Sequence, residues 1–250
     1  MKTEKRPQVS IVIPYINDVE TLRGTIKSLY ETIDVSSFEV IIVQDGGNER
    51  YDGPTEKNMQ HVEHPFNLGV GAAFDTGVRL ARSHNIFLMG ADIRFQDNGW
   101  ASRMLKVLSK NQKSLICTVC KSFGKSTSYY GADVIFKVKN ENLGPKHPKK
   151  NDMNYKAAME GKWRKRTGRG VYEIPCLMGA FYGVSKSWYE FVRGFELHYK
   201  WGVLEPYISL KSWRVGGNVL IDTDNVTEHV WRAPSRSADY NALAYNQYMV

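Results

Sequence analysis

Carboxylates follow apolar runs at two places in the N-terminal half of the chain. Asp45 closely follows the run Phe38–Val43 and precedes two glycines, and Asp92 follows the run Ile86–Met89. At the first place a carboxylate can accept hydrogen bonds from a nucleobase, or it can simply form the turn that Asp-Gly pairs favour. At the second place it suits a hard divalent cation, which prefers oxygen ligands, or it caps a turn.

Three further sites carry residues that could do chemistry. The segment Asn67–Gly71 opens an expected helix, where free N–H groups suit a phosphate, although a plain loop has the same pattern. Glu205 begins another expected helix and is either a general base or a partner of the helix dipole. His229 ends an expected strand and is either a metal ligand or a structural hydrogen-bonding residue.

The elements that position these residues alternate between strands and helices. Nearly continuous apolar runs at Val9–Pro14, Phe38–Val43 and Ile86–Met89 predict strands buried on both faces, and Asp18 is expected to cap the helix after the first. Further strands are expected at 60–63, 115–120, 132–136, 218–221 and 225–230, and further helices at 71–83, 99–110, 186–192 and 204–215. This α/β alternation predicts a mainly parallel sheet, whose ligands bind beyond the carboxyl ends of the strands.

The regular pattern breaks down between Lys121 and Arg169, where one strand is expected and a long loop otherwise. From Lys137 to Arg169 there are eleven basic and three acidic residues, whereas the rest of the chain has 23 of each. The whole net charge of +8 therefore lies in this segment, which indicates a local function.

Composition excludes several classes of protein. With 250 residues, 42% hydrophobic residues and a mean hydropathy of −0.42, the chain is neither disordered nor collagen-like. No apolar window is long enough for a membrane span, and no apolar run near the N-terminus resembles a signal peptide, so a cytoplasmic location is expected. We interpret Cys117, Cys120 and Cys176 as small core residues of a reducing compartment; a metal or redox role for the C-x-x-C pair is the alternative.

Short motifs from Val9 to Arg232 together resemble a known family. They are Pro14 at a strand end, V-Q-D-G at 43–46, N-L-G-V-G at 67–71, F-L-M-G-A-D at 87–92, M-G-A-F-Y-G-V-S at 178–185, W-G-x-x-E at 201–205, S-L-K-S-W-R-V-G-G at 209–217 and E-H-V-W-R at 228–232. The chain resembles the nucleotide-sugar glycosyltransferases of the GT-A fold in glycosyltransferase family 2, and its C-terminal half is similar to the polypeptide N-acetylgalactosaminyltransferases. The resemblance implies one GT-A domain over 1–250, with a sugar-donor half at 1–120, a basic loop segment at 121–170 and an acceptor and catalytic half at 171–250.

The resemblance also implies roles for particular residues. Asp92 and His229 would bind a divalent cation, Mn²⁺ or Mg²⁺, and Glu205 would be the catalytic base of an inverting enzyme or bind sugar hydroxyls in a retaining one. The site for the nucleotide sugar, expected to be a UDP-sugar, would comprise Pro14, Tyr15, Asp45, Asn67, Gly71, Ala91, Asp92, Gly179, Ala180, Trp201 and Gly202.

Three residues depart from the family pattern. Gly90 stands in place of the first carboxylate of the metal-binding D-x-D, Gln44 in place of the first Asp of D-D-G, and Leu204 where a Glu is expected. Either diphosphate oxygens complete the metal's ligands, or basic residues such as Arg232 and Arg236 take over part of its work.

The basic segment suggests a polyanionic acceptor. Acceptor or phosphate contacts are expected from Lys162, Arg164, Lys165, Arg166 and Arg232. With Tyr155 and Trp163 among the cations, DNA carrying hydroxymethylated bases is one candidate. The alternatives are a solvated or diphosphate-binding lid with a glycan, lipid-linked or protein acceptor, and a non-catalytic module that binds nucleotide sugar or nucleic acid. The sequence indicates no oligomeric state.

Overall fold

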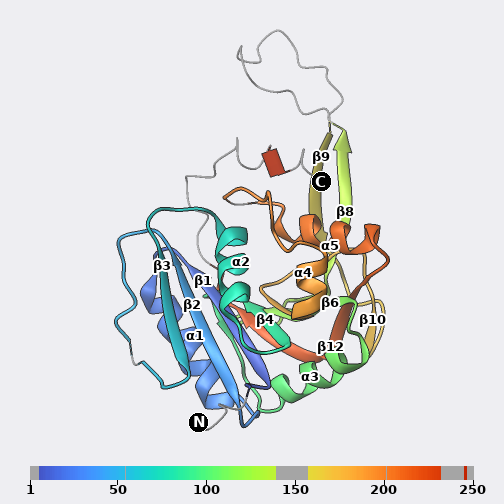
Figure 1. Cartoon of the computed structure of the whole chain (residues 1–250). Coiled ribbons are helices and arrows are strands. Elements are labelled where there is room, and N and C mark those ends of the chain that lie inside the picture. Colours follow the sequence, from blue (N-terminus) through green and yellow to red (C-terminus); the bar gives the residue numbers. More distant parts are fainter. Residues whose placement is uncertain (1–5, 54, 139–156, 201, 232–244, 247–250) are drawn as a thin grey trace.

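A mixed sheet forms the centre of the molecule. The computed structural model describes residues 6–53, 55–138, 157–200, 202–231 and 245–246. The strand order is β10-β12-β6-β11-β4-β1-β2-β3 (Figure 1). These strands are β1 (Val9–Tyr15), β2 (Phe38–Asp45), β3 (Met59–His64), β4 (Asn85–Met89), β6 (Ser114–Ser122), β10 (Val171–Glu173), β11 (Phe181–Ser185) and β12 (Asn218–His229). Two short strands, β5 (Ile93–Arg94) and β7 (Ser128–Tyr129), pair with β12 and β6.

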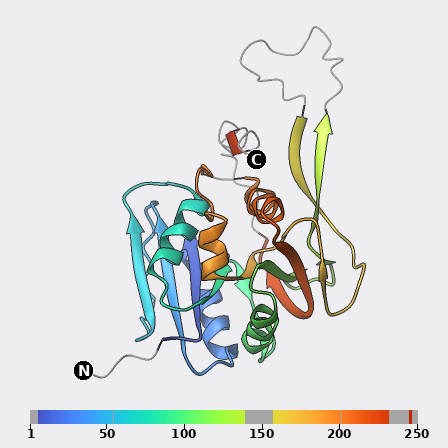
Figure 2. The ribbon, with the colours of Figure 1, turned by 45° about the vertical axis from the view of Figure 1, so that its right-hand side comes forward.

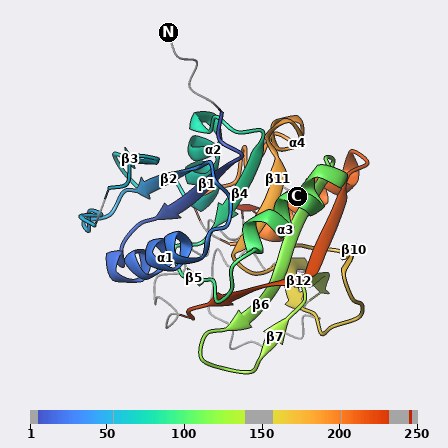
Figure 3. The ribbon, with the colours of Figure 1, turned by 90° about the horizontal axis from the view of Figure 1, so that it is seen from below.

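Helices cover both faces of this sheet (Figure 3). Apolar side chains of α1 (Val19–Thr32) and α3 (Trp100–Lys110) share one buried cluster with β1, whereas α2 (Val70–Leu80), α4 (Lys186–Phe191) and α5 (Leu204–Arg214) contribute to a second. The first cluster contains an aromatic stack in which the Trp100 and Phe95 rings lie 3.7 Å apart. Because both faces are covered, β1 and β2 are buried along almost their whole length and are mainly apolar, as the sequence predicts.

Strand direction confirms the expected mainly parallel α/β sheet. β1 pairs in parallel with β2 and β4, β2 with β3, and β6 with β12, whereas β11 lies antiparallel between β4 and β6. The carboxyl ends of β1, β2 and β4 consequently meet at one edge, which brings Tyr15, Asp45 and the Gly90–Asp92 turn to the same side. Among the described residues no helix is long and apolar enough to cross a bilayer.

The basic segment contains more structure than one strand, so that prediction was wrong. β8 (Ala132–Val138) pairs antiparallel with β9 (Ala157–Trp163), and the two form a hairpin that stands away from the main sheet (Figure 2). The β9 sequence mixes Gly, Lys and Glu with its apolar residues, so its strand pattern is weak until β8 supplies a partner.

The last strand also differs from expectation. Two strands are expected at 218–221 and 225–230, but β12 is one strand whose register on β6 shifts between Asp222 and Val226. The polar residues 223–225 that suggest a break in the sequence form an irregularity in the ladder instead. This keeps Glu228 and His229 in register with β6 and β5.

Candidate active site

Asp92 and His229 face each other at the carboxyl end of β4. Asp92 Oδ1 lies 3.5 Å from His229 Nε2, and both side chains are largely buried. The Val230 N–H donates to the Asp92 carbonyl at 2.8 Å, which ties the end of β12 to the turn after β4. The sequence separates these residues by more than a hundred positions, and pairing of β5 with β12 brings them together.

Gly90 occupies the position of the missing first carboxylate for a steric reason. A side-chain carbon on Gly90 would lie 2.6 Å from Asp92 Oδ1 and 2.9 Å from the Ala180 side chain. The Gly90 N–H also donates to the Ala180 carbonyl at 2.7 Å, so the turn after β4 packs against the loop of Gly179 and Ala180. A second acidic side chain at Gly90 would force this contact apart.

Glu205 lies in the first turn of α5 and contacts that same loop through Tyr182. The Tyr182 hydroxyl donates to Glu205 Oε1 at 2.8 Å and is also in contact with the Gly179 carbonyl. Burial raises the pKa of Glu205, and the hydrogen bond from Tyr182 opposes that rise without cancelling it. A carboxylate of raised pKa is a stronger base than an exposed one and therefore suits proton abstraction.

Cys120 is buried near the same loop of small residues. Burial raises the pKa of its thiol to about 12, and the nearby Cys117, Asp92 and Glu205 act in the same direction. A side-chain carbon on Gly179 would lie 3.0 Å from the Cys120 side chain, so the small-residue loop passes directly over it. All three cysteines are buried and free, as a core role predicts. Asp92, the Gly179–Ala180 loop and Glu205 thus form one continuous site.

Asp45 is buried, and its carboxylate is bonded by two nearby main-chain N–H groups and by the His64 side chain. Oδ1 accepts from the Leu68 N–H at 2.9 Å and lies 2.8 Å from His64 Nδ1, and Oδ2 accepts from the Gly69 N–H at 2.7 Å. The Val70 N–H donates to the Lys200 carbonyl at 3.1 Å. The N–H groups of Leu68, Gly69 and Val70 are therefore not free, and the prediction of free N–H groups at this helix start was wrong for these three residues. Asp45 instead holds the loop that carries the exposed Asn67.

Pro14, Tyr15 and Ala91 are buried parts of the strand ends. The Tyr15 hydroxyl donates to Gln44 Oε1 at 2.7 Å and accepts from the Tyr51 N–H at 2.8 Å. The Ala91 carbonyl accepts from the hydroxyl of Thr25 at 2.6 Å. These groups position the main chain around the expected nucleotide site.

Gly71 and Gly202 serve the packing of the loop before α5. A side-chain carbon on Gly71 would lie 2.8 Å from Cβ of Phe195 and 3.0 Å from Nδ1 of His198. The Gly202 carbonyl accepts from His198 Nε2 at 2.9 Å, and Gly202 has a φ of 100°, which favours glycine. Trp201, the other expected residue of this motif, lies outside the described residues.

Of the expected acceptor contacts, Lys162, Lys165 and Arg166 are exposed. Arg164 is largely buried and ion-paired with Asp133, and Arg166 lies over the Tyr130 ring. Arg232 and Arg236 lie outside the described residues. Arg164 and Arg166 therefore already have partners, Asp133 and Tyr130, within the protein.

The comparison with protein-family models decides the classification. Residues 10–190 match the model of glycosyl transferase family 2. The chain belongs to this family. The match spans both the strand ends with Asp45 and Asp92 and the Gly179–Ala180 loop.

Curated relatives and solved structures agree with this family 2 assignment. The chain is 21% identical over 245 residues to polypeptide N-acetylgalactosaminyltransferase 8 of Drosophila melanogaster, covering 92% of this chain and 39% of that one. It is 24% identical over 150 residues to a dolichyl-phosphate beta-glucosyltransferase of Trichomonas vaginalis, covering 53% of this chain and 46% of that one. The chain therefore spans less than half the length of either relative.

Two solved structures share the fold of the family 2 domain. GalNAc-T7 with UDP, GalNAc and Mn²⁺ superposes with a TM-score of 0.71 at 15% identity, over 92% of this chain and 45% of that one. The mannosyltransferase PcManGT of Pyrobaculum calidifontis, in complex with GDP-Man and Mn²⁺, superposes with a TM-score of 0.60 at 12% identity, over 93% of this chain and 59% of that one. These similarities confirm the GT-A fold predicted from the motifs.

The donor set of the family 2 site fits a divalent cation held by two side chains. The Asp92 carboxylate and the His229 imidazole supply oxygen and nitrogen ligands 3.5 Å apart, which suit Mn²⁺. No group of three or more His, Cys, Asp or Glu residues in the described ranges is arranged to hold an ion. The arrangement therefore fits an ion that takes its remaining ligands from a bound diphosphate rather than a closed protein cage.

Sequence reasoning missed an aromatic cluster next to this pair. The Trp231 ring lies 4.1 Å from the His229 ring, 5.7 Å from Trp163 and 6.2 Å from Tyr129, centre to centre. Tyr129 and Trp163 are 4.5 Å apart, and Trp231 is 46% exposed. The E-H-V-W-R motif contains Trp231, but only the β8–β9 hairpin brings Trp163 against it.

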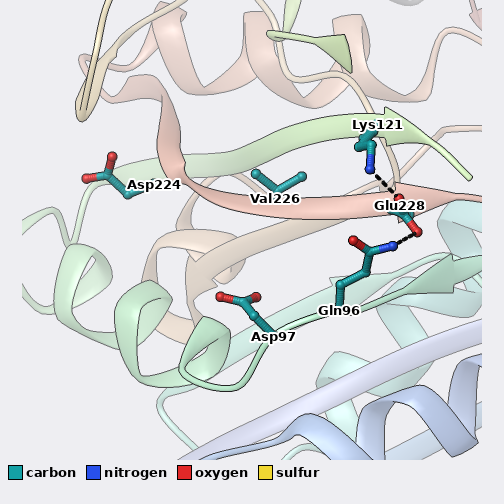
Figure 4. Close-up of a pocket in the computed structure, with 6 residues that line it drawn as sticks. All are labelled: Gln96, Asp97, Lys121, Asp224, Val226 and Glu228. Carbon is teal, nitrogen blue, oxygen red and sulfur yellow. Dashed lines mark hydrogen bonds and ion pairs between the residues drawn. The ribbon is translucent and has the colours of Figure 1, made fainter. Parts of the chain in front are cut away.

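A pocket of about 340 Å³ lies on the other side of the end of β12 (Figure 4). Its buried Glu228 carboxylate accepts from Lys121 Nζ at 2.8 Å and from Gln96 Nε2 at 2.6 Å. Successive strand residues point to opposite faces, so Glu228 points away from the site that contains His229. Its charge is compensated within the protein, and we interpret this ion pair as structural.

Proposed function

We propose that this family 2 domain transfers the sugar of a nucleotide-diphosphate sugar to an acceptor hydroxyl. The expected donor is a UDP-sugar. The observation that carries the proposal is the Asp92–His229 pair at 3.5 Å, with Glu205 linked through Tyr182 to the Gly179–Ala180 loop that packs against the turn of Asp92. In this division of roles, residues 1–120 contribute most of the sugar-donor site and residues 171–250 the base and the acceptor side.

Charge at the leaving diphosphate is the first chemical requirement. A divalent cation bound by Asp92 and His229 would supply positive charge at the departing diphosphate. Asp92 is oriented by the turn that packs on Ala180, and His229 by the register of β12 on β5. Both side chains are thus held in place before a ligand arrives, which is what electrostatic stabilisation of a transition state requires.

Proton removal from the acceptor is the second requirement. Glu205 is the base in this proposal because burial raises its pKa and because its position is set by Tyr182. The Tyr182 hydroxyl has one proton and faces two acceptors, Glu205 and the Gly179 carbonyl. When Glu205 takes up a proton it can donate to Tyr182, which then donates to Gly179, so the protonated form gains a complete set of hydrogen bonds.

The acceptor side is bounded by aromatic rings. Trp231, Trp163 and Tyr129 lie together beside His229 and offer apolar ring faces next to the reacting centre. Sugar rings present apolar C–H faces that pack on such surfaces, so we propose a glycan acceptor. The curated relatives are named for polypeptide and dolichyl-phosphate acceptors, so protein and lipid-linked acceptors are the competing candidates.

The DNA acceptor remains a prediction without support from these comparisons, and the ion pair of Arg164 with Asp133 reduces the charge available for phosphates. A cytoplasmic location likewise remains a prediction.

The test is an incubation of the protein and Mn²⁺ with labelled UDP-hexoses or GDP-mannose. Separate reactions contain oligosaccharides, a lipid-linked phosphate, peptides, or duplex DNA with hydroxymethylated bases. Transfer to an oligosaccharide supports the full proposal, and transfer to another acceptor would replace the glycan. Hydrolysis of the sugar donor alone would show an enzyme for an acceptor not in the panel. Nucleotide binding with neither transfer nor hydrolysis would refute catalysis and indicate a binding module.

A further inference from the structure

The turn that carries Glu205 into the site has an unusual backbone. Lys200, Gly202 and Val203 have φ values of 51°, 100° and 60°. Val203 is β-branched, and such residues rarely adopt the left-handed region. It is also the N-cap of α5, and no side chain caps that helix start. A conformation of this kind persists only where surrounding contacts over-determine it.

Those contacts come from a residue far along the chain. Asn246 is fully buried, its Oδ1 accepts from the Tyr199 N–H at 2.8 Å, and its Nδ2 donates to the Tyr199 carbonyl at 2.8 Å. Nδ2 also lies 3.1 Å from the Gly202 carbonyl. One side chain therefore bonds the main chain at both ends of the turn, as a neighbouring strand would.

His198 completes the same arrangement from inside. Its Nε2 lies 2.9 Å from the Gly202 carbonyl, and because a carbonyl only accepts, Nε2 must carry the proton. The Gly202 carbonyl thus receives one donor from His198 and one from Asn246 immediately before the helix that begins with Leu204 and Glu205. On its other side the turn is bonded to α2, where the Val70 N–H donates to the Lys200 carbonyl.

We propose that Asn246 and His198 are positioning residues for Glu205: they hold the turn 199–203 in its strained form and so fix where α5 begins. This inference rests on the proposed function for its kinetic consequence, because it assigns Glu205 the role of base. A displacement of about 1 Å at a reacting group can cost about a hundredfold in rate, so a loosened turn should lower kcat. Asp45 and the strand ends on its side of the site are not part of this turn, so the Kd for UDP should change much less than kcat.

The experiment compares Asn246→Ala with Asn58→Ala. Asn58 is a matched control, because its Nδ2 donates to a main-chain carbonyl, that of Phe38, at 3.1 Å and its Oδ1 accepts from the Tyr30 hydroxyl at 3.0 Å, at the amino end of β2 and away from the strand ends that carry the site. The measurements are kcat and KM for the UDP-sugar, the Kd for UDP with Mn²⁺, and amide hydrogen exchange over residues 198–207. Asn246→Asp is the second variant, since it keeps the acceptor for the Tyr199 N–H but loses both donors.

We expect Asn246→Ala to lower kcat about 10- to 100-fold, to leave the Kd for UDP within about threefold, and to speed exchange in 198–207. Asn58→Ala should leave kcat within about threefold and leave exchange over 198–207 unchanged. Unchanged exchange in 198–207, or faster exchange with unchanged kcat in both Asn246 variants, would overturn the inference. If the wild-type protein transfers no sugar, the proposed function fails instead, and the exchange comparison still decides whether Asn246 holds the turn.

Discussion

The hydrogen bond between Tyr182 and Glu205 offers a direct test of the proposed base. The Tyr182 hydroxyl donates to Glu205 Oε1 at 2.8 Å within a buried environment. This bond favours the ionised carboxylate, while burial favours the protonated form and is the larger effect, so the pKa of Glu205 is raised overall. Tyr182→Phe removes only the hydroxyl and should therefore raise the pKa of Glu205 further.

The size of this effect follows from the strength of the bond. A hydrogen bond to a charged group contributes about 1.5–3 kcal/mol, which corresponds to about a 10- to 150-fold change in the ionisation constant. The base must be unprotonated to act, so the acid limb of the pH–rate profile should move to higher pH. At a fixed pH on that limb kcat should fall by up to the same factor, whereas at high pH it should approach the wild-type value.

The assay is the pH dependence of kcat for sugar transfer, with Tyr189→Phe as the control. Tyr189 is also buried and its hydroxyl donates to a carboxylate, Asp75 Oδ1, at 2.5 Å, so the control removes the same kind of bond outside the site. Both variants should lose a similar amount of stability, but only Tyr182→Phe should shift the acid limb. An acid limb that stays in place, or that moves equally in both variants, would refute Glu205 as the base.

The remaining predictions concern the rest of the site and the core. Asp92→Asn should lower turnover at least about a hundredfold and weaken the thermal stabilisation by UDP with Mn²⁺. Asp45→Asn should raise the Kd for UDP about tenfold, measured by calorimetry, because one carboxylate oxygen that orders the Leu68–Gly69 loop is replaced. Glu205→Gln should abolish transfer. At pH values above the raised pKa of Glu205 the wild-type protein must hold a buried charge, so the variant should have the higher melting temperature there. Below about pH 4 both side chains are neutral and this gain in melting temperature should vanish. Trp100→Ala should cost about 3–5 kcal/mol in urea unfolding, since the ring is fully buried in an aromatic stack.

Much of the fold can be predicted from the sequence because its signals are local. Runs such as Val9–Pro14 and Phe38–Val43 are apolar except for one residue each, which identifies strands covered on both faces. Asp18 caps α1 as expected, accepting from the Thr21 N–H at 3.1 Å. The positions of the carboxylates after these strands then follow from chain order alone.

The β8–β9 hairpin and the antiparallel β11 could not be predicted in the same way. A strand such as β9 is stabilised by its partner across the ladder, and that partner is not adjacent in the sequence. The same reason hides the aromatic cluster, because Trp163 ends β9 and Trp231 follows β12, and these two strands of different sheets are far apart in the sequence.

By itself, the sequence determined the α/β class, the family and the identity of the polar residues at the strand ends, because each depends on residue type and local order. Tertiary structure alone decided what those residues do: Asp45 orders a loop, Asp92 meets His229 at 3.5 Å, and burial raises the pKa of Glu205 against the opposing hydrogen bond from Tyr182. Distance and burial control hydrogen bonding and ionisation, and both are properties of residues brought together from distant parts of the chain.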